Sequence, residues 1–342
     1  MGNIKKITSM PLQDTAVGYY RVLQPTRVMR REGLIKDCRS LPFSGEHQGQ
    51  YFDFNDKMYM QICKDTDVIW TTIPFKPDFL LRDLNLRKHW GAKLIIDIDD
   101  NLYAVPSDNP NADLARRQKN AFEAAMRIAD GVTVSVPNLK RLYGPLNDNI
   151  HVMPNAMDFS IWDKVKIKKN TSSKVRIGWR GAMGHKDDLE MIEPVLKQLM
   201  KDYDIEIVTL GYQPSFKTEH HEWVGCLDYP AKLGSLGLDI GIIPLVDSSF
   251  NRAKSNLGYL DFSSINVPTV LSPTENQRGM AAMEAKNSYE WYESLKSLIE
   301  DKNKRVLLGV KANKFIRENY DVRKIVVPTY KWMDKLPFRH DI

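Results

Sequence analysis

The sequence predicts an α/β protein made of two doubly wound halves that face a central cleft. Three observations lead to this fold class. Apolar, strand-like runs alternate with amphipathic helical stretches, which is the pattern of parallel sheets built from β-α-β units. A Lys-rich segment at 163–173 interrupts the series near the middle. At 342 residues the chain is also long for a single hydrophobic core, so two domains are the default.

The elements of the first half follow one another in a regular order. Strands are expected at Lys6–Met10, Asp67–Ile73, Lys93–Ile98, Gly131–Val136 and Ile150–Pro154. Helices are expected at Tyr19–Arg31, Pro77–Trp90, Ala112–Ala129 and Pro137–Tyr143. Because the apolar runs are separated by helical stretches, they predict a parallel sheet with helices packed on it.

A second series follows the Lys-rich segment, whose end, Asn170-Thr171-Ser172-Ser173, is typical of an exposed linker. Strands are expected at Lys174–Trp179, Ile205–Leu210, Trp223–Leu227, Leu238–Leu245 and Val267–Leu271. Helices are expected at Asp187–Asp202, at Pro230–Gly234, from Asn256 onwards, and over Ser288–Asn319. The tail, Asp321–Leu336, predicts one more helix with a kink or a break at Pro328, because proline cannot donate a backbone hydrogen bond.

Composition narrows the class of protein without selecting a partner. The hydrophobic share of 42% and the charged share of 27% are ordinary for a globular protein. No stretch approaches the roughly 20 apolar residues that span a bilayer. Cys38, Cys63 and Cys226 are odd in number and lack zinc-site spacing, which indicates reduced thiols and a cytoplasmic protein. The net charge of +6 suits nucleotide phosphates, nucleic acid or an anionic membrane, and equally a solvated basic surface.

The stretch Phe250–Asp261 carries the most information about function. It follows the apolar run Leu238–Leu245 and opens a helix, so it lies at the carboxyl end of a parallel strand, where open α/β sheets bind ligands. Helix N-termini attract anions through free N–H groups and the helix dipole. We therefore expect a diphosphate to be bound by Lys254, Ser255, Asn256 and Leu257. Asp261, about two helical turns further on, could accept hydrogen bonds from sugar hydroxyls, notably of ribose. The alternative is a surface lysine and a solvated aspartate.

A glycine-rich loop follows the first strand of the second half, with the sequence Gly178-Trp179-Arg180-Gly181-Ala182-Met183-Gly184-His185. Glycines let a backbone approach a phosphate closely, and a guanidinium can bind a phosphate with two donors. We expect the nucleotide site to include Gly178, Arg180, Gly181 and His185. The spacing is not G-x-G-x-x-G, and an ordinary flexible loop is the alternative.

Three carboxylates end a buried strand in Ile95-Ile96-Asp97-Ile98-Asp99-Asp100. Side chains alternate along a strand, so Asp97 and Asp99 share a face and Asp100 opens the loop. Such a group could hold a hard cation, serve as a general base or only cap a turn. We expect Asp99 to be catalytic, Asp97 and Asp100 to lie on the acceptor side, and no metal to be bound.

Two further segments of the first half are expected on the acceptor side. Gly18-Tyr19-Tyr20-Arg21 follows the first strand, where the glycine permits a tight turn into a helix and Arg21 could face the cleft. Asn155, in Val152-Met153-Pro154-Asn155-Ala156-Met157-Asp158, suits a turn that closes the first domain. Turn formation alone would also explain this second segment.

These segments, in this order, resemble the retaining glycosyltransferases of the GT-B fold, in particular glycosyltransferase family 4 and its phage and prokaryotic "DiDD" relatives. The resemblance covers nearly the whole chain. It rests on the joint order of Gly18–Arg21, Ile96–Leu102, Ala129–Ser135, Val152–Asp158, Gly178–Gly181, Lys254–Asp261 and Trp291–Tyr320.

The resemblance implies two Rossmann-like domains. An acceptor-side domain would cover residues 1–162, a linker 163–173 and a donor domain 174–320, and a last helix in 321–342 would return to the first domain. The implied reaction moves a sugar from a nucleoside diphosphate sugar, UDP- or GDP-linked, to an acceptor hydroxyl with retention. It would need no metal and no other cofactor.

The resemblance also implies roles for single residues. Arg180 and Lys254 would stabilise the leaving diphosphate. Asp261 would take the place of the second Glu of the family's E-x7-E motif, on ribose. Ala253 stands where the first Glu of that motif would lie, so the sugar contact of that Glu is absent or rearranged.

The acceptor is left open at this stage. A glycan, a lipid-linked sugar and a hydroxymethylated base in DNA are each compatible, and the DNA version draws on the net charge and on basic clusters such as Arg116-Arg117. The helix Pro77–Trp90 could contact an anionic membrane or pack on the sheet. The competing function is a catalytically degenerate GT-B protein that binds sugar nucleotides or a partner. The resemblance implies the cytoplasm of a prokaryote or of a phage-infected cell.

Overall fold

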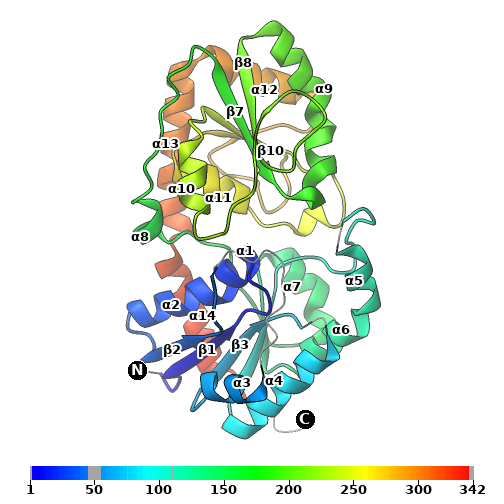
Figure 1. Cartoon of the computed structure of the whole chain (residues 1–342), viewed down its shortest axis with the longest axis vertical. Coiled ribbons are helices and arrows are strands. Elements are labelled where there is room, and N and C mark those ends of the chain that lie inside the picture. Colours follow the sequence, from blue (N-terminus) through cyan, green and yellow to red (C-terminus); the bar gives the residue numbers. More distant parts are fainter. Residues whose placement is uncertain (1, 45–54, 75, 110, 339–342) are drawn as a thin grey trace.

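A computed structural model describes residues 2–44, 55–74, 76–109 and 111–338. It contains two six-stranded sheets, one in each half of the chain, with helices packed around them (Figure 1). The strand orders are β2-β1-β3-β4-β5-β6 and β12-β11-β10-β7-β8-β9, and every pairing is parallel. The predicted fold class, two doubly wound α/β halves, is therefore confirmed.

The first sheet is covered on both faces, which explains why its central strands are continuous apolar runs. Its strands are β1 Lys6–Met10, β2 Asp37–Ser40, β3 Val68–Thr72, β4 Lys93–Ile98, β5 Gly131–Val134 and β6 Ile150–Val152. The helices of this half are α1 Ala16–Gly18, α2 Gln24–Arg31, α3 Asp56–Ile62, α4 Pro77–Trp90, α5 Ala112–Arg117, α6 Lys119–Ile128 and α7 Pro137–Tyr143. In α4, Leu80 and Leu86 are buried in the core below this sheet, whereas Leu81 is 59% exposed.

The second sheet is built in the same way. Its strands are β7 Val175–Gly181, β8 Ile205–Gly211, β9 Glu219–His221, β10 Ile240–Ile243, β11 Thr269–Leu271 and β12 Met283–Glu284. Its helices are α8 Phe159–Trp162, α9 Lys186–Asp202, α10 Tyr229–Ser235, α11 Leu257–Ser264, α12 Ser288–Glu300 and α13 Lys302–Asn319. Leu196 of α9 and Leu295 of α12 belong to one apolar cluster, and Leu260 of α11 and Ile316 of α13 to another.

Several predicted boundaries are wrong, and polar strands account for most of the errors. Trp223–Leu227 is not a strand; the edge strand is β9, whose Glu219 binds the guanidinium of Arg176 at 2.7 Å. A strand at Asp37–Ser40 was not predicted for the same reason, since it is half polar. Asp301 divides the long helix Ser288–Asn319 and caps α13 by accepting a hydrogen bond from Lys304 N.

Three helical predictions also change in detail. The stretch Tyr19–Arg31 begins as a π-helical turn, Tyr19–Leu23, and only then becomes α2. The stretch Ala112–Ala129 is divided at Gln118. The last helix, α14 Val322–Lys335, continues through Pro328, so the predicted break is wrong.

The chain crosses between the halves twice, and the two crossings are bonded to each other. Met157 N donates to Tyr320 O at 2.8 Å, and Val322 N donates to Met157 O at 3.1 Å. After the second crossing, α14 lies beside α2 and adds Val326 and Met333 to the core of the first sheet. The last helix of the chain is therefore packed against the first half.

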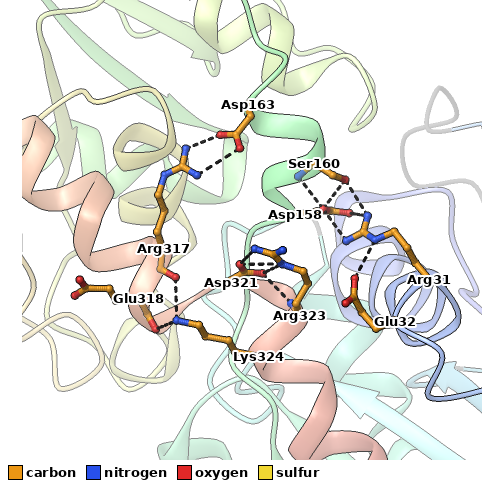
Figure 2. Close-up of polar contacts among 10 residues, drawn as sticks. All are labelled: Arg31, Glu32, Asp158, Ser160, Asp163, Arg317, Glu318, Asp321, Arg323 and Lys324. Carbon is orange, nitrogen blue, oxygen red and sulfur yellow. Dashed lines mark hydrogen bonds and ion pairs between the residues drawn. The ribbon is translucent and has the colours of Figure 1, made fainter.

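Ion pairs surround this double crossing (Figure 2). Arg31 of α2 binds Asp158 at 2.9 Å, and Arg317 of α13 binds Asp163 at 2.5 Å. Asp158 also caps α8, since it accepts from Ser160 N, and Asp321 caps α14 in the same manner. Asp158 thus fixes both the start of α8 and its contact with α2.

We expect Asp158→Ala to lower the free energy of unfolding by about 1–2 kcal/mol, because it removes a helix cap together with an ion pair. Asp158→Asn keeps a capping oxygen and should cost less than about 1 kcal/mol. The comparison is made by urea unfolding, with Asp163→Ala, whose ion pair is exposed, as the control. Equal losses for Asp158→Ala and Asp163→Ala would contradict this account of the crossing.

The stabilisation by the Asp158 carboxylate should also depend on pH. Although burial opposes it, hydrogen bonds from Arg31 and Ser160 lower the pKa of Asp158 below its usual range. A lowered pKa gives stability that is present above the unfolded value of about 3.9 and is lost as pH falls through the folded value. The difference between wild type and Asp158→Asn should therefore be largest near neutral pH and shrink below about pH 4.

Candidate active site

A cavity of about 220 Å³ lies between the two halves, at the carboxyl ends of β4, β7 and β10. This is the edge at which open α/β sheets bind ligands. It brings together eight of the residues that the sequence predicted for the site: Asp99, Asp100, Asn155, Arg180, His185, Lys254, Ser255 and Leu257. The first three come from the first half and the other five from the second, so both halves build one site.

The two loops of the second half that border the cavity are joined by Asp188. One of its carboxylate oxygens lies 2.8 Å from His185 Nδ1 in the loop after β7. The other accepts hydrogen bonds from Val246 N at 2.8 Å and from Asn251 Nδ2 at 2.7 Å, both in the loop after β10. His185 is therefore held beside the cavity by a buried carboxylate.

Arg180 ends β7 and forms an ion pair with Asp261 of α11, with Nη2 and Oδ2 2.5 Å apart. Tyr229 donates a hydrogen bond to the same carboxylate at 3.0 Å. Burial, followed by the charge of Asp261, raises the pKa of Tyr229 well above its usual value, so this hydroxyl keeps its proton. Within the described part of the chain, Arg180 Nε and Asp261 Oδ1 have no hydrogen-bond partner. The pair is buried and yet incompletely satisfied.

Lys254 reaches across the cleft. Its ammonium binds Asp100 of the first half at 2.7 Å and lies 4.2 Å from the centre of the Phe250 ring. The side chain of Lys254 is 19% exposed and that of Asp100 is 33% exposed. This pair is more accessible than the pair of Arg180 and Asp261, and it joins the two halves directly over the cavity.

Asp99 is the carboxylate with the most unusual acidity at this site. Burial, together with the neighbouring charges of Asp100 and Asp97, raises its pKa to about 7. A carboxyl group with such a pKa can hold or release a proton near neutral pH. Perturbed acidity in a cleft is typical of functional groups, although buried structural networks can produce it as well.

A second cavity, of about 150 Å³, adjoins the first and shares Val17, Asp99 and Asp100 with it. The remaining lining contains one more carboxylate, that of Asp97, and is otherwise apolar or uncharged, with Leu12, Ile73, Leu102, Asn109, Asn111 and Phe250 among its residues. Asp99 therefore stands where the two cavities meet. No lysine or arginine lines this second cavity in the part of the chain that the structure describes.

Arg21 lines neither cavity, contrary to the expectation that it faces the cleft, whereas Asp97 borders the second cavity. Both are 1% exposed, and Arg21 binds Asp97 through two hydrogen bonds of 3.0 and 2.8 Å. Arg21 Nη1 also donates to Met153 O and to Asn155 Oδ1, while Thr133 donates to Asp97. Because both charges have partners inside the first half, the pair stabilises the wall of the second cavity. Asn155 extends this support by donating to Ser255 Oγ of the second half at 2.8 Å.

The other predicted residues lie around the cavity without lining it. Gly18 is packed closely, since a Cβ there would lie 2.6 Å from Pro11 Cβ, and Tyr19 and Tyr20 pack against Cys226 of the second half. Gly178 faces Leu238, and Gly181 accepts a hydrogen bond from Tyr212 N. The amide of Asn256 points to Met280 Sδ at 3.9 Å, away from the predicted diphosphate site.

Sequence reasoning missed three residues of this site: Asp188, Tyr229 and Gln277. Asp188 could have been found, because it is an acidic residue in the first turn of the helix after the glycine-rich loop. Tyr229 opens a short helix and gives no signal of its contact with Asp261, which is 32 residues away. Gln277 comes from a loop without any recognisable motif.

Among the described residues, no three His, Cys, Asp or Glu side chains lie together as a metal ion would require. None of the helices in the described ranges is long and apolar enough to cross a membrane.

No protein-family description and no curated protein matches the sequence. Solved structures do match. An alpha-glucosyltransferase in complex with UDP and a 13-mer DNA containing an HMU base has a TM-score of 0.69 and 10% identity, over 97% of this chain and 100% of that one. HepE of Anabaena, in complex with UDP and glucose, has a TM-score of 0.66 and 10% identity, over 97% and 100% of the two chains.

TarM of S. aureus is similar too, with a TM-score of 0.60 and 14% identity over 81% of this chain. This chain spans 57% of the length of TarM. At such identities the likeness establishes the fold, which is the GT-B fold that the sequence resemblance predicted.

Removing the cation of the buried pair should be costly. We expect Arg180→Met to lower the free energy of unfolding by about 3–5 kcal/mol, because it leaves the Asp261 carboxylate buried without a cation. The double variant Arg180→Met/Asp261→Asn should recover part of that loss. Arg252→Met, in the exposed pair with Asp247, is the matched control and should cost less than about 1 kcal/mol. Urea unfolding measures all of these; equal losses for Arg180→Met and Arg252→Met would contradict the buried-pair account.

Proposed function

We propose that this chain is a retaining glycosyltransferase, which moves a sugar from a nucleoside diphosphate sugar to an acceptor hydroxyl. One observation carries the proposal. Arg180 and Lys254 of the second half meet Asp99 of the first half around a single cavity, at the carboxyl ends of two parallel sheets. Two cations and a titratable carboxylate are the groups that transfer from a diphosphate leaving group requires.

The cations have a direct electrostatic task in this proposal. As the bond between sugar and diphosphate breaks, negative charge develops on the leaving phosphate, and fixed cations in a water-poor cavity stabilise that charge. Arg180 is held rigidly by Asp261, whereas Lys254 has a flexible stem and a partly exposed ammonium. Lys254 can turn from Asp100 to a phosphate oxygen. The two side chains supply the positive charge themselves, and we infer that no divalent metal is required.

Asp99 is the proposed acceptor of the hydroxyl proton. It lies where the cavity with the cations meets the second cavity, whose described lining holds no lysine or arginine. With a pKa of about 7, it is ionised in a large share of molecules at neutral pH. The hydroxyl of an acceptor in the second cavity would thus meet both the base and the sugar carbon.

The proposed donor is a UDP-sugar, with a GDP-sugar as the next choice. Support comes from HepE, which was solved with UDP and glucose, and from the similar alpha-glucosyltransferase, which was solved with UDP and DNA. The acceptor is proposed to be a compact, neutral, hydroxyl-bearing group. A glycan residue and a hydroxymethylated base in DNA both meet that description, and the second cavity offers them apolar walls without a cation.

A second candidate function has its own observation. Arg180 and Lys254 each already bind a carboxylate of this chain, and position 253 is an alanine. A catalytically degenerate protein that binds sugar nucleotides without turnover would also fit these facts. Slow hydrolysis of the donor in the absence of any acceptor separates the two, because only a transferase releases free nucleoside diphosphate.

A nucleotide screen should identify the donor. We expect one of UDP, GDP, ADP or CDP to stabilise the protein against heat, by about 2.7 kcal/mol when the ligand is present at 100 times its Kd. Lys254→Ala should abolish most of this stabilisation, because it removes a phosphate-binding cation. Lys311→Ala, on the exposed side of α13, is the control and should behave as wild type. If no nucleotide stabilises wild type, the transferase proposal fails, and a protein that binds some other partner becomes the better explanation.

The acidity of Asp99 predicts a pH profile for transfer. The rate should rise with pH and level off above about 7, where the carboxylate is ionised. Asp99→Asn should lower kcat by about 10²- to 10⁴-fold. Asp247→Asn, at an exposed carboxylate, should change neither the rate nor its pH dependence. A wild-type profile without an inflection near pH 7 would remove Asp99 from the base role.

The pH dependence of protein stability provides an independent measure of the pKa of Asp99. The folded pKa of Asp99 lies above the unfolded value of about 3.9, so its contribution to stability is present in acid and is lost as pH rises towards 7. Asp99→Asn should therefore melt at a higher temperature than wild type above pH 7 and at a similar temperature below about pH 4.

A further inference from the structure

The side chain of Gln277 lines the cavity that Arg180 and Lys254 share, and no role has been assigned to it so far. The residue is 1% exposed. Its Oε1 has no hydrogen-bond partner among the described residues. A buried amide oxygen in this state has lost its contact with water without gaining a protein donor, which is unfavourable and uncommon in native structures. It needs a donor that the chain does not supply.

The loop that carries Gln277 is fixed at three points. Leu245 N donates to Ser272 Oγ at 2.9 Å, and Glu275 accepts two hydrogen bonds of 2.9 Å from Arg141 of α7. Asn276 donates to the carbonyl oxygens of Arg252 and Lys254, at 3.1 and 3.0 Å. Because these contacts tie the loop to both halves, the buried amide is a built feature of the cavity wall.

The chemistry of an amide oxygen selects among the parts of a nucleotide sugar. Oε1 can only accept, so it needs a group with a hydrogen to give. The diphosphate is anionic and offers no such hydrogen near neutral pH, and its partners in the cavity are Arg180 and Lys254. The neutral donors of the ligand are the hydroxyls of the sugar and the ribose and the N–H groups of the base. The position of the Gln277 loop beside Ala253 favours the transferred sugar among them.

We propose that Gln277 accepts a hydrogen bond from a hydroxyl of the donor sugar, and thereby sets which sugar the site takes. The inference rests on the proposed function, and it names the residue of that site that recognises the transferred group. Ala253 supports it by its position. Asn276 binds the carbonyl groups on both sides of Ala253, so the Gln277 loop lies against this apolar residue. A sugar bound there finds a polar partner on the loop rather than at position 253.

The test compares a nucleotide with its sugar ester in wild type and in Gln277→Leu. UDP and UDP-glucose are the probes, and binding is measured by calorimetry. Wild type should bind UDP-glucose more tightly than UDP through the added contact. In Gln277→Leu the affinity for UDP-glucose should fall about 10- to 100-fold, because a buried hydroxyl is left without its acceptor. The affinity for UDP itself should be unchanged.

Gln24→Leu is the matched control, since Gln24 is also buried, has an unpartnered Oε1 and does not line the cavity. It should leave binding of both probes as in wild type. Without ligand, Gln277→Leu should be at least as stable as wild type, because it removes an unsatisfied buried oxygen. A purely structural role for Gln277 would instead lower stability and weaken both probes alike.

The outcomes distinguish failure of the proposed function from failure of the role of Gln277 alone. If wild type binds neither UDP nor UDP-glucose, and none of the other nucleotides, the proposed function fails and the inference fails with it. If wild type binds both and Gln277→Leu keeps the wild-type preference for UDP-glucose, only the role of Gln277 is overturned. Equal binding of UDP and UDP-glucose by wild type would overturn it as well.

Discussion

The site depends on one constraint, which is that the carboxyl edges of the two parallel sheets face each other across one cavity. All loops that follow the strands of a parallel sheet leave at the same edge. The double crossing, where Met157 is bonded to both Tyr320 and Val322, ties the first crossing segment to the second. After the second crossing α14 packs on the first half, so the first half is built from both ends of the chain. Two facing edges bring together side chains that are more than a hundred residues apart.

This arrangement explains what could be predicted from the sequence. Lys254 and Arg180 each follow or end an apolar, strand-like run, which predicted that both lie at the carboxyl edge of a sheet. Both line the cavity. Their partners could not be predicted. The bond of Lys254 to Asp100, 154 residues away, depends on how the halves are rotated, and no local pattern encodes that rotation. The strand β9 was missed because an edge strand needs no apolar run.

The two buried arginine–aspartate pairs differ in how many of their polar atoms have hydrogen-bond partners, and this difference distinguishes a structural pair from a ligand-binding one. Arg21 gives hydrogen bonds to Asp97, to a carbonyl and to Asn155, so its cost of burial is offset inside the first half. Arg180 and Asp261 are buried as well, and each retains an atom without a partner. A buried charge pair that is only partly satisfied is expensive in a static protein. The unpartnered atoms of Arg180 and Asp261 are better explained as hydrogen-bonding positions for a ligand.

In the proposed function, each group of the cavity has a separate task. Arg180 and Lys254 would bind the anionic part of a donor, the amide of Gln277 would accept from a neutral hydroxyl, and Asp99 would take the proton of an acceptor. Burial and two neighbouring carboxylates raise the pKa of Asp99 to about 7, and one of these carboxylates, Asp100, is bound to Lys254. If a phosphate draws Lys254 away, Asp100 loses its partner and its charge acts more strongly on Asp99, which makes Asp99 a stronger base. Donor binding and proton acceptance would then be coupled through one lysine.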